Sequence, residues 1–99
     1  MADKLSESEI KSKIETMPEW SEVSGEIQRT YEFDDFRASM AFVEKVADLA
    51  EEAQHHPDIL IRYNRVMLTL STHDAGGLTV KDFDLASRCD ELVAAAARG

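Results

Sequence analysis

The first part of the chain changes from helical to strand-like spacing of its apolar residues. Residues 6–9 read Ser-Glu-Ser-Glu, a capping-box pattern, and apolar residues at helical spacing follow, which predicts a short first helix. Pro18 ends that helix, and Trp20 opens a strand region. Residues 22–33 then alternate between apolar and polar as half-buried strands do. We therefore expect two short strands on either side of residues 25–26.

A long central helix follows, which Asp34 or Asp35 can cap. Its apolar residues form two adjacent stripes, so we expect an apolar arc that is wide enough to cover a sheet. The first stripe contains Phe36, Met40, Val43, Ala47 and Ala50, and the second contains Phe42, Val46, Leu49 and Ala53.

The next stretch is a predicted β-hairpin. Residues 59–63 and 66–70 are β-branched and aliphatic runs, and residues 64–65, Asn-Arg, are typical of a tight turn between them. A turn centred there puts three apolar pairs on one face of the hairpin and a mixed set on the other. The same register, extended past the open end, pairs His56 with His73 at about 5 Å.

The last part of the chain is predicted to be a loop and a helix. Residues 74–77 are typical of a loop, and Thr79-x-x-Asp82 predicts the helix start. Its buried side is expected to contain Val80, Phe83, Leu85, Ala86, Cys89, Leu92, Val93 and Ala96. The order of elements predicts an α+β fold in a single domain over residues 1–99. We expect a two-layer sandwich in which a four-stranded antiparallel sheet carries three helices on one face.

Composition narrows the functional classes. The net charge of −9, from 20 acidic and 11 basic residues, argues against direct binding of nucleic acid or of an anionic membrane, since both need a basic patch. Cys89 is the single cysteine and cannot form an internal disulfide, which fits a reducing compartment. The chain opens without a basic-then-apolar leader, and no apolar run approaches the ~20 residues of a membrane span. We therefore expect a cytoplasmic protein.

All three histidines, His55, His56 and His73, lie within one short stretch of the chain. Imidazole exchanges protons near neutral pH with little tuning, so the cluster predicts acid–base catalysis. Zinc sites on helices favour histidines three to five residues apart, a spacing that this sequence lacks. Ser71 and Thr72 lie beside His73 but have no nucleophile elbow. The pattern therefore favours a metal-free site.

The spacing of these residues closely resembles the signature of the pterin-4a-carbinolamine dehydratase family. The matching positions are Glu51, His55, His56, Pro57, Tyr63, His73 and Asp82, together with Trp20 and the run Thr72-His73 followed by Gly76-Gly77-Leu78-Thr79. The resemblance covers nearly the whole chain. It implies elimination of water from a 4a-hydroxytetrahydropterin to give the quinonoid dihydropterin, without a metal or an organic cofactor. It also implies a homodimer or a pair of dimers.

The family resemblance further implies roles for individual residues. His55 and His73 would form the proton-transfer pair, with Glu51 orienting His55, while His56 would bind the substrate and share in proton transfer. Substrate-binding residues would also include Asp58, Ser71, Thr72 and Asp82. The hydroxylated pterin arises from an aromatic amino acid hydroxylase, which is the implied metabolic partner.

Two other roles stay open at the level of sequence. Members of the family also serve as dimerisation cofactors, or coactivators, of a homeodomain transcription factor, which they bind through a helix surface. An accessory protein that binds pterin without turnover is a further alternative. A binding module should tolerate His55→Ala and His73→Ala, and an enzyme should not.

Overall fold

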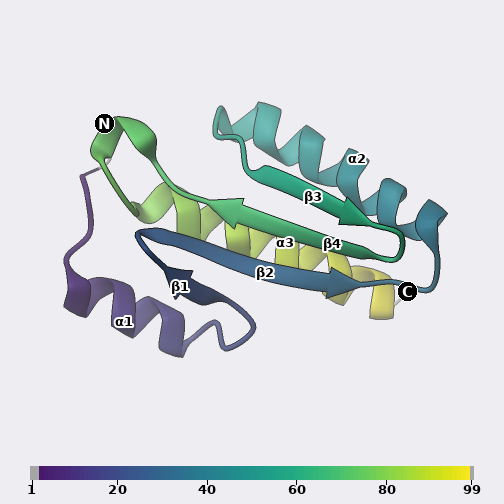
Figure 1. Ribbon diagram of the computed structural model, residues 1–99, viewed down its shortest axis with the longest axis horizontal. Coiled ribbons are helices and arrows are strands. Elements are labelled where there is room, and N and C mark those ends of the chain that lie inside the picture. Colours follow the sequence, from purple (N-terminus) through teal and green to yellow (C-terminus); the bar gives the residue numbers. More distant parts are fainter. Residues whose placement is uncertain (1–2, 99) are drawn as a thin grey trace.

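The structure is a computed structural model that describes residues 3–98. Helices and strands follow one another in the predicted order (Figure 1). The elements are α1 (Glu7–Glu15), β1 (Ser21–Val23), β2 (Glu26–Glu32), α2 (Phe36–Ala53), β3 (Asp58–Arg62), β4 (Arg65–Leu70), the short 3-10 helix η1 (His73–Ala75) and α3 (Val80–Arg98). Within the described residues, none of these helices is both long enough and apolar enough to cross a membrane.

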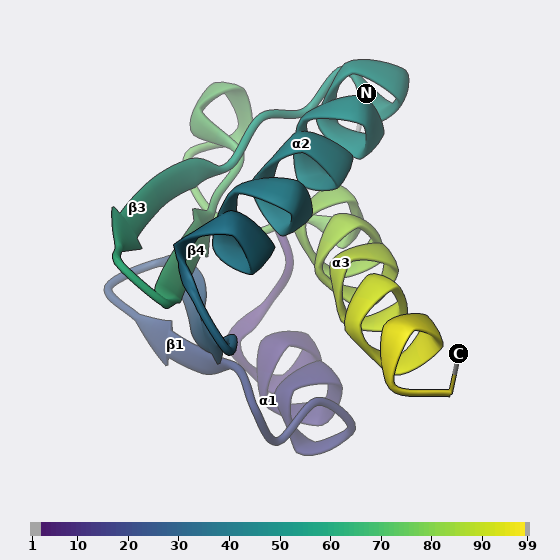
Figure 2. The same ribbon diagram turned by 90° about the vertical axis from the view of Figure 1, so that its right-hand side faces the viewer.

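The four strands form one antiparallel sheet in the order β1-β2-β4-β3. All three helices lie on one face of this sheet (Figure 2). The core lies between the two layers, where Ile27 and Leu68 of the sheet and Phe42 and Leu85 of the helices are buried. The predicted two-layer α+β fold is therefore confirmed.

Local signals in the sequence set several element boundaries. At the start of α1, the Ser6 backbone N–H donates to the Glu9 carboxylate at 2.9 Å, and the Glu9 N–H donates to the Ser6 hydroxyl at 3.2 Å. Asp35 caps α2 through the backbone N–H of Ala38 at 2.8 Å. These contacts satisfy donors that the first turn of a helix leaves free, so both caps act as the sequence predicts.

The turn between β3 and β4 lies one residue earlier than predicted. Tyr63 and Asn64 form the turn, with a Tyr63 φ of 51°, and Arg62 pairs with Arg65. The Asn64 carbonyl accepts from the Phe33 N–H at 2.8 Å, and the Asn64 amide donates to the Phe33 carbonyl at 3.0 Å. This contact with the end of β2 holds Asn64 in the turn. The register changes by two residues, so the paired residues of both strands keep their predicted faces. Tyr63 does not, because it lies in the turn and is 66% exposed.

Only part of the predicted apolar arc of α2 faces the core. Phe42 is buried, whereas Phe36 is 48% exposed and Ala47 is also exposed, so the predicted burial of the latter two was wrong. The arc is wider than the surface it covers, because α2 lies at the edge of the helix layer (Figure 2). Val80, at the start of α3, is exposed too. The side chain of Ala96, also predicted to be buried, lies outside the described residues.

Candidate active site

The two adjacent histidines have different surroundings because of how α2 ends. Gln54 caps the helix in the left-handed conformation, with a φ of 53°. This conformation turns the chain away from the helix axis, and the His55 N–H then donates to the Ala50 carbonyl at 3.1 Å. The His55 side chain is only 11% exposed, while that of His56 is 59% exposed.

The side chain of Asp82 contacts the ring of His55. Its Oδ1 lies 2.6 Å from His55 Nε2, and its side chain is fully buried. Its Oδ2 accepts hydrogen bonds from the Thr72 hydroxyl at 2.8 Å and from the Thr79 backbone N–H at 3.0 Å. When the carboxylate is ionised it can only accept hydrogen bonds, and the proton of the first contact then belongs to Nε2. In the neutral imidazole with this tautomer, the second ring nitrogen of His55, Nδ1, carries a lone pair.

Glu51 pairs with the exposed histidine. Its Oε2 lies 2.5 Å from Nε2 of His56, and its side chain is 73% exposed. The prediction that Glu51 orients His55 is therefore wrong. Because α2 ends at Ala53, a carboxylate in the last turn reaches the second residue after the cap rather than the first. An exposed pair of this kind contributes roughly 0–1 kcal/mol, so it orients His56 only weakly.

The loop that carries His73 is connected to His55 through Asp82. An isolated bridge between Thr72 and Gly77 closes this loop, and η1 within it presents His73 at the surface. The Thr72 hydroxyl is bonded to the same carboxylate that holds His55. Asp82 thus joins the two chain segments that carry the predicted proton-transfer pair.

The other predicted site residues lie near the start of β3 and after the end of β4. The predicted pairing of His56 with His73 is wrong, because β4 ends at Leu70 and the chain then turns into η1. Ser71 is half-buried at the start of that turn. Asp58, which follows His56 and Pro57 in the sequence, is exposed at the start of β3.

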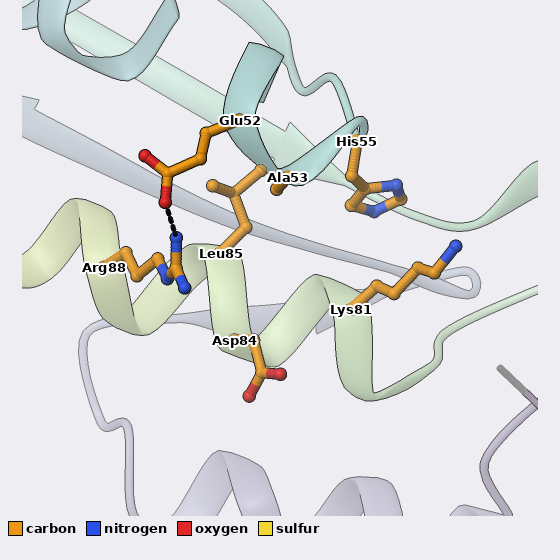
Figure 3. A pocket seen from close by; sticks show the side chains of 7 residues that line it. All are labelled: Glu52, Ala53, His55, Lys81, Asp84, Leu85 and Arg88. Atoms are coloured by element: carbon orange, nitrogen blue, oxygen red, sulfur yellow. Dashed lines mark hydrogen bonds and ion pairs between the residues drawn. The ribbon is translucent and has the colours of Figure 1, made fainter. Parts of the chain in front are cut away.

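A pocket of about 210 Å³ lies between the end of α2 and the start of α3 (Figure 3). It is lined by Glu52, Ala53, His55, Lys81, Asp84, Leu85 and Arg88. Arg88 and Glu52 form an ion pair at 3.1 Å across one end, and Lys81 extends from α3 on the side of the His55 ring. Sequence reasoning missed Lys81 and Arg88, since exposed basic residues on a helix have no distinctive spacing.

Two further observations bear on the chemistry available to the site. Among residues 3–98, no group of three or more His, Cys, Asp or Glu side chains is arranged to hold a metal ion. Cys89 is buried in the core, and burial raises the pKa of its thiol to about 12. This cysteine is therefore a neutral packing residue, as predicted.

Comparison with known proteins identifies the family. The family model described as "Pterin 4 alpha carbinolamine dehydratase" matches residues 3–92. The chain belongs to the pterin-4a-carbinolamine dehydratase family. A provisionally named pterin-4-alpha-carbinolamine dehydratase from Chloroflexus aurantiacus is 57% identical over 90 residues, which cover 91% of this chain and 97% of the relative. Another, from Picosynechococcus sp., is 51% identical over 92 residues, or 93% of this chain and all of the relative.

A solved structure supports the same assignment for this dehydratase family member. The crystal structure of a transcriptional coactivator/pterin dehydratase from Brucella melitensis superposes with a TM-score of 0.86 at 33% identity. The match covers 90% of this chain and 97% of that one. The protein is accordingly an enzyme with pterin-4a-carbinolamine dehydratase activity, a hydro-lyase, and its substrate is a pterin.

Proposed function

We propose that the enzyme recycles the pterin cofactor of an aromatic amino acid hydroxylase, by converting 4a-hydroxytetrahydropterin to quinonoid dihydropterin and water. The observation that supports this most is the contact between buried Asp82 and Nε2 of His55. It provides an imidazole of fixed orientation with one nitrogen free, as proton transfer to a bound ring requires. The proposed reaction uses no metal and no organic cofactor. The cytoplasmic location expected from the sequence stays a prediction.

The proposed step is a redox-neutral elimination with two proton transfers. The N5–H bond of the substrate breaks and its proton moves to Nδ1 of His55. The electron pair of that bond forms the N5=C4a double bond, and the C4a–O bond breaks with its electron pair on the oxygen. His73, in its protonated form, gives a proton to this oxygen, which leaves as water. Asp82 stabilises the positive charge that develops on His55, and each transfer contributes roughly 10² to 10⁴-fold.

The other site residues are proposed to bind or to position. The exposed His56 and the half-buried Ser71 would bind the substrate. Thr72 already donates its hydroxyl proton to Asp82, and Asp82 is fully buried, so both are proposed as positioning residues. Asp58 is exposed and can serve either the substrate or a neighbouring subunit.

The activity can be measured directly by stopped-flow absorbance with freshly made 4a-hydroxytetrahydropterin. We expect the wild-type enzyme to accelerate loss of this compound by on the order of 10⁴-fold or more, because each of the two proton transfers contributes at least about 10²-fold. Treatment with a chelator should leave the rate unchanged. No acceleration would overturn the proposed reaction, and loss of activity after chelation would overturn its metal-free step alone.

We also propose that the enzyme is a homodimer formed through β3. This strand is an edge of the sheet, and its Ile59 and Leu60 are 37% and 47% exposed. Edges of this kind readily pair with another strand. A two-fold axis at Leu60 would place Asp58 of each subunit opposite the partner's Arg62, which gives two such pairs. Opposite charges in directly facing positions stabilise strand pairing. Neither charge forms an ion pair within residues 3–98.

The dimer can be tested by charge exchange. Arg62→Asp should shift the protein toward the mass of one chain in size-exclusion chromatography with light scattering, because two acidic pairs then face each other. Adding Asp58→Arg should restore the dimer. Arg65→Asp, an exposed change on the neighbouring strand, is the matched control and should leave the mass unchanged. A wild-type mass of one chain would refute the dimer, and a mass of four chains would indicate the pair of dimers.

A second role is suggested by the name of the Brucella melitensis structure, which includes a transcriptional coactivator. This role needs a protein partner that the chain binds as a stoichiometric module. It does not require the histidines, so His55→Ala would leave it intact while slowing the dehydration. In the same variant the rate of dehydration would fall while the affinity for pterin would be kept. The variant therefore separates catalysis from pterin binding without turnover.

A further inference from the structure

A second carboxylate on α3, Asp90, collects hydrogen bonds from three side chains of the sheet layer. The Trp20 indole N–H donates to its two oxygens at 3.0 and 3.1 Å, the Arg29 guanidinium at 2.7 Å and the Tyr31 hydroxyl at 2.6 Å. The guanidinium also lies over the Tyr31 ring, 4.3 Å from its centre. We call these four residues the Asp90 cluster. The cluster ties α3 to β2 and to the residue that precedes β1.

The Asp90 cluster and the active site are connected by the rigid body of α3. Asp82 and Asp90 are eight residues apart, which corresponds to about 12 Å along a helix axis. Asp82 meets His55 and Thr72, and Asp90 meets the cluster. Because the rise and rotation of a helix are fixed by its backbone hydrogen bonds, holding Asp90 also fixes where Asp82 lies.

We propose that the Asp90 cluster is a positioning device for the active site, because it sets the axial position and the rotation of α3 and so holds Asp82 against His55. This inference rests on the proposed function. The side chains between the two carboxylates that face the core are apolar, and include Leu85, Ala86 and Cys89. Apolar contacts are not directional, so they alone would permit a small slide of the helix. Short hydrogen bonds to Asp90 from three directions do not permit this slide.

The stability of the fold alone gives no reason for an ion pair between Arg29 and Asp90. The Arg29 side chain is only 19% exposed, and its buried Nε has no hydrogen-bond partner in the described structure. The Asp90 side chain is 28% exposed, so the ion pair is partly buried. Replacing a buried ion pair by apolar residues often leaves stability equal or higher, whereas such pairs can specify one arrangement of the elements. Burial, and then the hydrogen bond to Asp90, raise the pKa of Tyr31, so its hydroxyl remains a donor at any working pH.

The test combines steady-state kinetics with a signal from His55 itself. Asp90→Asn should lower kcat by about tenfold and leave KM within about twofold, as expected for a slightly misplaced catalytic group. Tyr31→Phe, which removes a single hydrogen bond, should have a smaller effect in the same direction. In NMR spectra of imidazole-labelled protein, the Nε2-bound proton of His55 should exchange with water about tenfold faster in Asp90→Asn. All measurements are made well below the Tm of each variant.

Ile27→Val is the matched control. It removes a buried methyl group from the same strand without touching Asp90, so it should lower Tm and leave both kcat and the His55 signal unchanged. If Asp90→Asn and Tyr31→Phe behave like this control, the cluster only stabilises the fold and the proposal is overturned. Tyr31→Phe alone decides the matter if Asp90→Asn does not fold. The His55 signal needs no turnover, so failure of the proposed reaction remains distinguishable from failure of the positioning.

Discussion

Replacing His55 and His73 together by alanine should lower kcat for the dehydration by on the order of 10⁴-fold or more. Both proposed proton transfers are then left to water, and each is worth roughly 10² to 10⁴-fold. Stopped-flow absorbance with 4a-hydroxytetrahydropterin measures the effect. Each single variant should show a smaller loss, because the remaining imidazole still carries one transfer. Since His73 is exposed, its replacement should leave Tm nearly unchanged.

His56→Ala is the control for this double variant. As the exposed neighbour, His56 is proposed to bind the substrate, so its loss should raise KM more than it lowers kcat. Circular dichroism and Tm should confirm that all variants fold. A double variant that retains kcat within tenfold of wild type would refute acid–base catalysis by these imidazoles, and it would favour the binding roles instead.

Asp82→Asn should lower kcat by on the order of 10²-fold and also destabilise the protein. The neutral amide no longer stabilises positive charge on His55, and its nitrogen cannot accept a hydrogen bond, so one of the groups facing it loses its acceptor. An unsatisfied buried donor costs about 1–3 kcal/mol. Urea unfolding measures the second effect, and stopped-flow kinetics at a temperature where the variant is folded measures the first.

The matched control is Asp48→Asn, an exposed carboxylate in α2. It removes the same charge at the surface, so it should change neither kcat nor the free energy of unfolding by more than a small amount. If Asp82→Asn lost stability but kept kcat, the carboxylate would be a helix cap alone. The contact with His55 would then have no part in the chemistry.

The faces of the strands could be predicted from sequence, but the register of the hairpin could not. Alternation has a period of two, so it assigns a side chain to a face and is unchanged when the pairing shifts by two residues. The shift itself was caused by contacts of Asn64 with Phe33, which is 31 residues away in the chain. Periodicity in a short window contains no information about such a contact.

The candidate site shows the same limit. Clustering in the sequence drew attention to the histidines, and the family resemblance added Asp82, but Glu51 rather than Asp82 was expected to be the partner of His55. The correct partner lies 27 residues further on and depends on how α3 packs. One missed signal was available: Arg29 shares the inward parity of Ile27 and Tyr31, and an inward-facing arginine requires a counter-charge, here Asp90.

The left-handed conformation of Gln54 has a consequence for how a repeated residue acquires two different surroundings. Had the helix continued, His55 and His56 would have been presented about 100° apart on one exposed surface, in nearly the same solvent. A single backbone angle instead buries most of one ring against the fully buried Asp82 and leaves the other exposed, beside the exposed Glu51. The two rings are chemically the same, so the difference between them lies in the side chains around them. Changing those neighbours would therefore change how each ring behaves.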